Sequence, residues 1–324
     1  MEALEYQPLK SQLEERKEKL LKAIDTNPGN PGFTDLLQQV DAALERIDHH
    51  TYGICEICSE EIEKEKLLID PLTTVCLSHM NREQQRALEA DLQFAAQIQG
   101  GLLPENNLTL NGWEFSYHYK PAGIVSGDFC DFIPAADNSV LFAVGDVSGK
   151  GISASMLMSQ LHALIRSLMT FNLPVNEIVK KTNRLFCESM IQSNYATLVL
   201  GRAGVDGSFE VCVAGHNPPL LLQNGKLTSL SATGVPVGLF CGSEYTVHKF
   251  KLERDDYLLL YTDGLTESDS GGEEYGPGRI EEHLIKLNGG CSGEIIKSLL
   301  LDHKNFLKDL QPKDDVTVAV IRRI

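Results

Sequence analysis

The stretch GDVSGKG, residues 145–151, follows the apolar run SVLFAV and combines one carboxylate, Asp146, with three glycines. A strand that leads into a glycine-rich turn is typical of a phosphate-binding loop, but that loop needs the spacing G-x-x-x-x-G-K-[ST]. Here three residues separate Gly145 from Gly149, and no serine or threonine follows Lys150. The spacing therefore argues against a nucleotide loop and directs attention to Asp146.

Other aspartates recur beside apolar, β-rich runs of the sequence. They are Asp128 and Asp131 in SGDFCDF, Asp146 in VLFAVGDVSGKG, Asp263 in LLLYTDGLTES, and Asp314 and Asp315 in KDDVTVAVIRR. Taken singly, an Asp-Gly or Asp-Asp pair is an ordinary turn sequence. Carboxylates at the ends of rigid strands can, however, converge from distant parts of the chain, and such hard oxygen ligands suit Mg²⁺ or Mn²⁺. The joint pattern predicts a divalent-metal site.

A second set of metal-ligand residues lies in YGICEICSEEIEKEKLLIDPLTTVCLSHM. Cys55 and Cys58 form one short-spaced pair, and after 17 intervening residues Cys76 and His79 form another. Two such pairs can complete a tetrahedron around Zn²⁺, and four protein ligands leave no open position for catalysis. We therefore predict one structural Zn²⁺ that folds this segment, because the alternative of incidental thiols leaves the spacing unexplained.

Helical periodicity surrounds the cysteine-rich segment. Apolar residues recur at helical spacing from Leu9 to Ile24 and from Leu36 to Ile47, on either side of DTNPGNPG, which predicts a helical hairpin. A further helix is expected over residues 81–103, ended by Pro104. Its spacing of 4, 3, 4 and 3 fits a coiled-coil seam through Leu88, Leu92, Ala95, Gln99 and Leu102. So short a seam also fits an amphipathic helix that packs on its own domain, and both interpretations stay open.

From about residue 105 the chain changes to an α+β pattern. Strand-like runs come first, ISASMLMSQLHALIRSLM and VNEIVKKTNRLFCESM then read as a pair of helices, and strands, helices and a last strand follow. We divide the sequence into residues 1–80, a hairpin with a zinc finger, residues 81–104, a linker helix, and residues 105–324, a catalytic domain.

The N-terminal segment, over roughly residues 9–80, resembles the DksA/TraR family of zinc-finger proteins through its hairpin, YGICEIC and PLTTVC. Family members bind RNA polymerase through an acidic hairpin tip, whereas the tip here, DTNPGNPG, contains one acid. The resemblance therefore favours a sensing or protein-docking module over a polymerase regulator.

The remainder resembles the PPM-type metal-dependent protein serine/threonine phosphatases, specifically their RsbU/SpoIIE branch. The matching stretches are SGDFCDF, GDVSGKG, ATLVL, AGHNPPLLL, GVPVGL, LLLYTDGLTES and DDVTVAVIR, in this order. The resemblance implies an α-β-β-α sandwich, in which two antiparallel sheets are flanked by helices, with a site for two Mn²⁺ or Mg²⁺ at one end. It also implies direct attack of a metal-activated water on phosphoserine or phosphothreonine, with no covalent enzyme intermediate.

The resemblance assigns roles to individual residues. Asp146 should bridge both metals, with the carbonyl of Val147 on one of them and Asp128 on the same side. Asp263 and Asp314 should complete the other metal, with Asp315 as an adjacent ligand or a partner of one. Eukaryotic relatives carry a histidine, a candidate general acid, at the place of Ser148. His216 is available for that role, although its proline-rich surroundings favour a structural turn, and Lys150 is either a phosphate contact or a solvated side chain.

Composition limits the classes of function. The chain has 324 residues, 42% of them hydrophobic, which is enough for two or three domains, and its formal net charge is −16. Such an acid excess disfavours an extended grip on nucleic acid or anionic membrane. The charged N-terminus lacks a signal-peptide core, so a cytoplasmic location is expected. Cysteines within apolar runs are expected to be buried thiols, and these are Cys130, Cys187, Cys212 and Cys241.

Three classes of function remain after these considerations. We predict a metal-dependent phosphoprotein phosphatase that acts on a regulatory protein, in this branch usually a small anti-sigma-factor antagonist, and that is controlled by its zinc module in a homodimer joined through the linker helix. The alternatives are a catalytically silent binding module of the same fold and a zinc-finger transcription regulator that acts on RNA polymerase. All the key aspartates are present, which favours the enzyme.

Overall fold

The computed structural model describes residues 7–26, 31–79, 82–189, 194–287, 289–308 and 310–324. The chain divides into two compact units, Met1–Asp91 and Leu92–Ile324, which we describe separately. The tip of the predicted hairpin at 27–30 and the predicted boundary between residues 80 and 81 lie outside the described residues.

The first unit contains the predicted helical hairpin. Helices α1 (Gln7–Thr26) and α2 (Pro31–Asp48) are followed by the short helix α3 (Lys64–Ile69) and a 3₁₀ turn, η2 (Leu77–His79). The two long helices share a buried core that includes Leu13 and Val40, and Cys55 and Cys76 belong to the same core. Hairpin and cysteine-rich segment therefore fold around one hydrophobic cluster.

The second unit is the predicted sandwich of two antiparallel sheets. One sheet has the order β1-β2-β11-β10-β7-β8 and the other β3-β4-β5-β6-β9. The strands are β1 (Leu108–Leu110), β2 (Trp113–Lys120), β3 (Asp128–Pro134), β4 (Val140–Val147), β5 (Ala196–Ala203), β6 (Ser208–Ala214), β7 (Leu220–Gln223), β8 (Lys226–Ser229), β9 (His248–Lys251), β10 (Tyr257–Tyr261) and β11 (Val316–Arg323). The fold class predicted from the sequence is confirmed.

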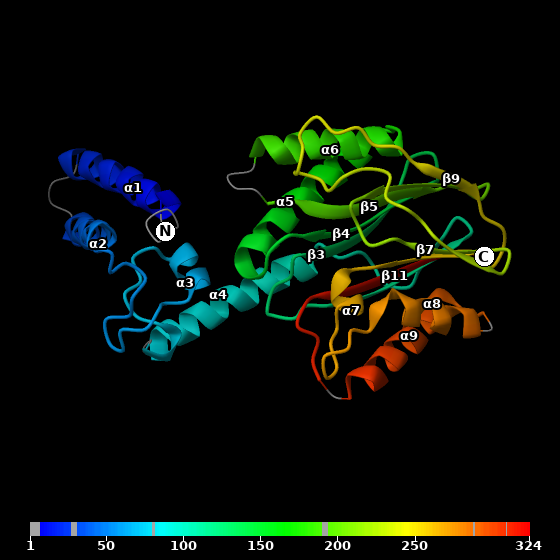
Figure 1. Ribbon diagram of the computed structural model, residues 1–324. Helices are drawn as coiled ribbons and strands as arrows, with labels where there is room; N and C mark the ends of the chain where they lie inside the picture. The colour runs from blue at the N-terminus through cyan, green and yellow to red at the C-terminus, as the bar shows by residue number, and fades with distance from the viewer. Residues whose placement is uncertain (1–6, 27–30, 80–81, 190–193, 288, 309) are drawn as a thin grey trace. The chain divides into compact units, whose positions relative to one another are not determined.

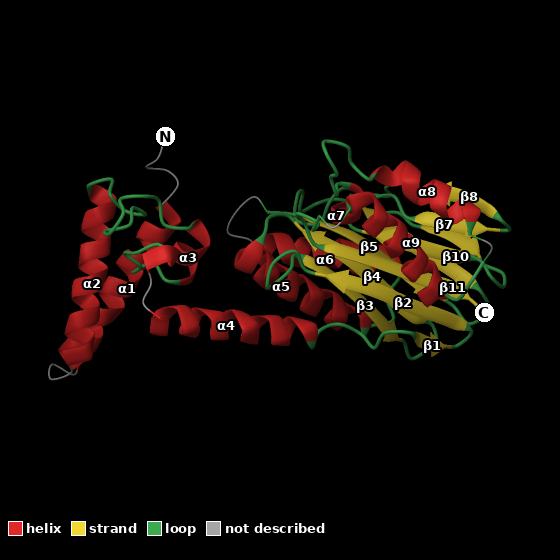
Figure 2. Ribbon diagram, turned by 90° about the horizontal axis from the view of Figure 1, so that it is seen from below, coloured by secondary structure: helices red, strands yellow, loops and turns green. Residues whose placement is uncertain are grey.

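Helices cover both outer faces of the sandwich (Figure 1, Figure 2). Helices α5 (Gly151–Met169) and α6 (Val175–Ser189) pack on the five-stranded sheet, and α8 (Gly276–Lys286) and α9 (Ser292–Leu307) pack on the six-stranded sheet. Aromatic side chains, among them Phe115, Phe132 and Phe142, fill the space between the sheets. One buried layer thus lies between the sheets, and one lies between each sheet and its helices. These three layers fix the strand ends from which the predicted site residues project.

Side chains of β3 alternate between the two buried layers. Cys130 and Phe132 face the other sheet, whereas Phe129 faces helices α5 and α6. This alternation, which follows from the two-residue period of a strand, places Asp128 on the inner face and Asp131 on the outer one. The two aspartates of SGDFCDF therefore cannot serve the same site.

Two expectations about single elements need correction or refinement. Cys187, in α6, and Cys241 are joined by a disulfide with their Cα atoms 5.6 Å apart, so they are not free thiols, whereas Cys130 and Cys212 are buried and free as predicted. A separation of 54 residues hides this contact from the sequence. Helix α4 (Arg82–Gly100) forms as predicted, but its residue Gln99, which belongs to the second unit, is buried against Ser126 of the same unit and does not lie on an open seam. Among the described residues, no helix is long and apolar enough to cross a membrane.

Candidate metal-binding sites

Asp128 and Asp146 lie directly opposite each other at the end of the β3–β4 pair. Asp128 is 1% exposed, and Asp146 is half-buried. A side chain in place of the Gly127 hydrogen would lie 2.9 Å from the carbonyl oxygen of Val147, so only glycine lets β3 begin this close to that carbonyl. The sequence SGD thus brings Asp128, Asp146 and the Val147 carbonyl to one strand end.

The other sheet holds Asp128 in place. The Oδ2 atom of Asp128 accepts hydrogen bonds from Thr262 Oγ1 at 2.8 Å and Thr317 Oγ1 at 2.6 Å. Thr262 follows β10 and Thr317 belongs to β11, so the six-stranded sheet orients a carboxylate that the five-stranded sheet carries. Both threonines are fully buried. Sequence analysis missed them, although each stands within two residues of a predicted ligand.

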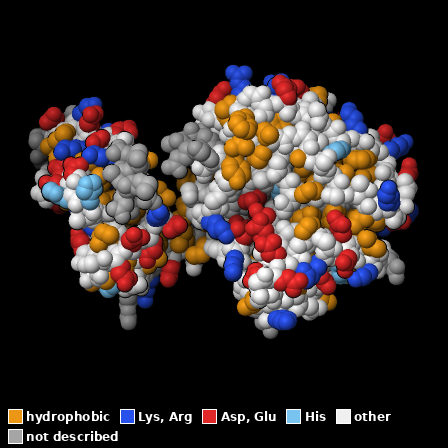
Figure 3. Space-filling view, in the orientation of Figure 1, with side chains coloured by type: hydrophobic (Ala, Val, Ile, Leu, Met, Phe, Trp, Pro, Cys, Tyr) orange, Lys and Arg blue, Asp and Glu red, His pale blue; other side chains and the backbone are white. Residues whose placement is uncertain are grey.

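Asp263, Asp314 and Asp315 reach the same end of the sandwich from the six-stranded sheet. Asp263 begins the short helix α7 (Asp263–Thr266), directly after β10, and the aspartate pair precedes β11. The Cα of Gly264 lies so close to the Asp315 carbonyl that a side chain there would clash. In the space-filling view a group of acidic side chains gathers beside the position of α7 (Figure 3).

The pKa values of Asp128, Asp146 and Asp263 in this cluster are shifted because water solvates their carboxylates poorly and because the carboxylates repel one another. Burial, followed by the charges of Asp263, Asp314 and Asp315, raises the pKa of Asp146 to about 7. Burial and Asp146 raise the pKa of Asp128, and burial and Asp314 raise that of Asp263. Divalent cations would offset such repulsion, and a site made only of carboxylate and carbonyl oxygens suits Mg²⁺ or Mn²⁺.

Asp314 and Asp315 differ in what their oxygens contact. Asp315 accepts hydrogen bonds from the backbone N–H of Ala122 at 2.7 Å and of Gly127 at 2.8 Å, one on each oxygen. Asp314 instead accepts a hydrogen bond from its neighbour's backbone, from the Asp315 N–H to Oδ1 at 2.9 Å, and its Oδ2 pairs with Lys150 Nζ at 2.6 Å. The geometry therefore leaves Asp314 as the better candidate ligand and gives Asp315 the task of holding the β2–β3 loop.

Two other residues singled out in the sequence lie apart from this cluster or have structural partners. Asp131 is buried under α5, where its Oδ2 atom lies 2.9 Å from both His162 Nε2 and Arg166 Nε. His216 is 5% exposed, its Nδ1 lies 2.7 Å from Thr197 Oγ1, and burial lowers its pKa to about 4. These contacts are those of a structural histidine.

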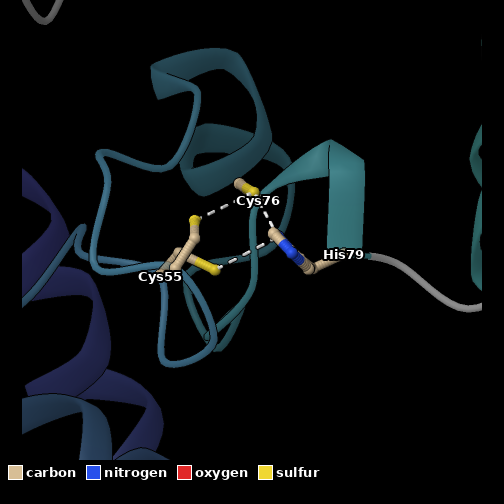
Figure 4. A group of neighbouring side chains, drawn as sticks. Cys55, Cys76 and His79 are labelled. Atoms are coloured by element: carbon tan, nitrogen blue, oxygen red, sulfur yellow. Dashed lines mark hydrogen bonds between the residues drawn. The ribbon is translucent and has the colours of Figure 1, made fainter.

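Cys55, Cys58, Cys76 and His79 form a compact cluster in the first unit, with all four potential ligand atoms within 4.8 Å of one another. The labelled side chains Cys55, Cys76 and His79 point toward a common centre (Figure 4). Cys58 Sγ lies 3.8 Å from Cys76 Sγ, the separation that zinc–sulfur bonds of about 2.3 Å produce in a tetrahedron. Although burial opposes it, backbone N–H groups lower the pKa of Cys55 to about 6, which favours the thiolate that zinc needs. The donor set and its spacing fit Zn²⁺.

Comparison with known proteins identifies the family of the second unit. Residues 136–324, more than half of the chain, match the family model described as "Stage II sporulation protein E (SpoIIE)". The chain is 28% identical over 248 residues to the phosphoserine phosphatase RsbU of Bacillus subtilis, a match that covers 74% of this chain and 72% of RsbU. It is 26% identical over 263 residues to the protein IcfG of Synechocystis, covering 72% of this chain and 41% of IcfG.

Solved structures agree with this relationship. The RsbU and RsbW domains of Rv1364c from Mycobacterium tuberculosis superimpose with a TM-score of 0.57 at 28% identity, over 66% of this chain and 60% of that one. The SiaA-PP2C domain of Pseudomonas aeruginosa shares the fold, with a TM-score of 0.65 at 20% identity over 74% of this chain and 99% of that domain. Because the family model covers more than half of the chain, the chain belongs to the SpoIIE family.

Proposed function

We propose that the chain is a metal-dependent protein phosphatase that hydrolyses phosphoserine or phosphothreonine on a regulatory protein. The convergence of Asp128, Asp146, Asp263 and Asp314 from both sheets carries this proposal, because the cluster offers the oxygen donors of a two-metal site. The relatives named phosphoserine phosphatases, RsbU and RsbP of Bacillus subtilis, support the substrate chemistry. The substrate class that we propose for this chain is a small anti-sigma-factor antagonist.

Each residue has a distinct task in this mechanism. Asp146 would contact both cations. The Val147 carbonyl and Asp128 would lie at one cation, and Asp263 and Asp314 would hold the other. Two bound Mn²⁺ or Mg²⁺ ions would supply an activated water in line with phosphorus. Thr262 and Thr317 keep the Asp128 carboxylate fixed, and Asp315 holds the loop that begins β3. Lys150, which pairs with Asp314, is proposed to contact the substrate phosphate as well.

The N-terminal part is proposed to regulate this site. We keep the division into a zinc module at 1–80, a linker helix at 81–104 and a catalytic domain at 105–324, and we place one structural Zn²⁺ on Cys55, Cys58, Cys76 and His79. The exposed side chains of Phe94 and Ile98 on α4 support dimerisation through that helix, since they are 63% and 53% exposed. The order of zinc module, helix and catalytic domain along the chain supports a regulatory role for the first two.

The test is hydrolysis of p-nitrophenyl phosphate and of a phosphoserine peptide by the full chain with Mn²⁺, Mg²⁺ or a chelator. We expect activity with added metal, none with chelator, and a loss of at least 1000-fold in Asp146→Ala, since a bridging ligand is removed. Asp206→Ala is the matched control, because Asp206 is an exposed aspartate in the turn between β5 and β6. Metal-independent activity, or full activity in Asp146→Ala, would refute the proposal.

A further inference from the structure

Gln99 is a buried polar residue at the C-terminal end of α4, a helix whose other described side chains are half-buried or exposed. Its side chain is 5% exposed, whereas Ile98 beside it is 53% exposed. The Gln99 amide makes two hydrogen bonds with the backbone of one residue: Nε2 donates to the Ser126 carbonyl at 2.7 Å, and Oε1 accepts from the Ser126 N–H at 2.9 Å. A side-chain amide satisfies both backbone groups at once, which neither a carboxylate nor an apolar side chain can do.

Ser126 is in direct contact with the candidate metal site. It is fully buried, and its Oγ accepts a hydrogen bond from the backbone N–H of Asp128 at 3.0 Å. Its neighbour Gly127 donates its N–H to Asp315 at 2.8 Å and accepts a hydrogen bond from the N–H of Val147 at 3.2 Å. A shift of Ser126 would therefore displace the start of β3 and, with it, the carboxylate of Asp128.

The loop that contains Ser126, residues 121–127, lacks regular secondary structure of its own. Side chains hold it from two directions. Asp315, just before β11, binds the N–H groups of Ala122 and Gly127, and Gln99, on α4, binds both backbone groups of Ser126. Asp315 belongs to the sandwich itself, but Gln99 reaches the loop only while the end of α4 lies against it.

We propose that Gln99 is a positioning residue that makes the docked position of α4 a condition for tight metal binding at the aspartate cluster. The inference rests on the proposed function, because it assigns to that same site a structural control. Loss of the Gln99 contact frees Ser126 and the start of β3, so Asp128 and the Val147 carbonyl lose their fixed relation. Outer partners that orient metal ligands typically change metal affinity by about 10- to 100-fold when removed.

The chain provides a matched control on the same helix. Gln97 is a glutamine two residues away whose side chain is exposed. Gln97→Ala therefore makes the same chemical change and the same change in helix propensity without touching the loop. Gln99→Met is the second test variant. Methionine keeps the buried volume of Gln99 and removes only the hydrogen bonds, whereas truncation to alanine can also reduce folding.

The experiment titrates Mn²⁺ into the full chain by calorimetry, with the zinc site loaded beforehand, and compares wild type, Gln99→Ala, Gln99→Met and Gln97→Ala. The same variants are assayed for hydrolysis at increasing Mn²⁺, which separates the Mn²⁺ concentration for half-maximal rate from the rate at saturation. We expect both Gln99 variants to bind Mn²⁺ 10- to 100-fold more weakly and to recover a saturated rate within about threefold of wild type. Gln97→Ala should match wild type.

Gln99→Met with wild-type Mn²⁺ affinity would overturn the proposal, as would a lower saturated rate at unchanged affinity. These outcomes differ from a failure of the proposed function. In that case the wild-type chain itself would bind no Mn²⁺ at the aspartate cluster or would bind it without hydrolysing any phosphate ester.

Discussion

At the residue scale, the adjacent aspartates 314 and 315 show how position decides the task of identical side chains. Both oxygens of Asp315 accept backbone hydrogen bonds, from Ala122 and Gly127, while Asp314 faces Lys150 and the acidic cluster. The KDD motif by itself left open which of the two acids binds metal. The hydrogen-bond partners of Asp315, which come from a loop almost 190 residues away in the sequence, support the proposal that Asp314 is the ligand.

We expect Asp314→Asn and Asp315→Asn to fail in different ways. Asp314→Asn should weaken Mn²⁺ binding at least tenfold with little effect on unfolding, because a ligand charge is lost. Asp315→Asn should lower the free energy of unfolding by about 1.5–3 kcal/mol, since an amide can replace one of two charged acceptors only. Calorimetric titration and thermal unfolding measure both effects, and wild-type Mn²⁺ affinity in Asp314→Asn would contradict the assignment.

His216 should make the stability of the second unit sensitive to acid. Its pKa is about 4 in the folded chain because burial disfavours the charged ring, against about 6.5 when unfolded. The unfolded state therefore takes up the proton first, and stability that is complete above pH 6.5 is lost as the pH falls toward 4. Between pH 7.5 and 5 this loss amounts to about 2 kcal/mol.

Replacement of His216 by glutamine should remove this component, so that the difference in unfolding free energy between wild type and His216→Gln shrinks by about 2 kcal/mol from pH 7.5 to 5. Denaturant unfolding at the two pH values measures it. His49→Gln, which removes an exposed imidazole, is the control variant. An equal pH dependence in wild type and His216→Gln would show that the buried ring does not titrate as described.

At the scale of secondary-structure elements, periodicity predicted helices and their order along the chain, whereas the sandwich of two sheets was implied by the family resemblance. The hairpin, the helix pair α5–α6 and the linker helix all follow from helical spacing of apolar residues, and the strand ends follow from the apolar runs that precede the aspartates. The contacts that the sequence could not reveal are long-range. The Cys187–Cys241 disulfide, the threonines that hold Asp128, and the pairing of Gln99 with Ser126 all depend on how elements meet.

Gln99 shows this limit most clearly. Its place in the 4-3-4-3 spacing was compatible with a coiled-coil seam, which treats the residue as one of a row of contacts between chains. In the structure Gln99 is buried against its own chain. The local sequence pattern does not show whether such a residue contacts its own chain or a second copy.

The cysteine-rich segment should depend on zinc for its fold. Cys55 and Cys76 are both part of the hairpin core, so loss of the metal would remove the bonds that hold these side chains together inside that core. We expect one zinc per chain by elemental analysis, and loss of zinc together with helical signal in Cys58→Ser or after treatment with a strong chelator. Cys291→Ser, at an exposed free cysteine, is the control and should retain full zinc content. A native helical signal in the zinc-free chain would contradict the prediction.

At the scale of the whole molecule, the described chain consists of two compact units with α4 extending across the division between them. The second unit carries the whole aspartate cluster, and the first carries the whole cysteine–histidine cluster. The chain covers 72% of RsbU and 41% of IcfG, so the relatives share the phosphatase unit within proteins of different length.

Helix α4 is the element that we expect to join two copies of the chain. Phe94→Ser combined with Ile98→Ser should convert a dimer into a monomer, because the two exposed apolar side chains lie one helical turn apart. Light scattering coupled to gel filtration measures the mass. Phe171→Ser, at a similarly exposed phenylalanine elsewhere, should have no effect. A wild-type chain that is monomeric at high concentration, or a double variant that stays dimeric, would contradict this role of α4.

The most direct test of the central claim is the number of Mn²⁺ ions that the zinc-loaded chain binds, measured by calorimetry for wild type and Asp146→Asn. The account predicts two Mn²⁺ per wild-type chain and a loss of both tight sites in Asp146→Asn, because that carboxylate is placed to contact both ions. Two ions bound equally well in the variant, or no tight Mn²⁺ binding in the wild type, would contradict it.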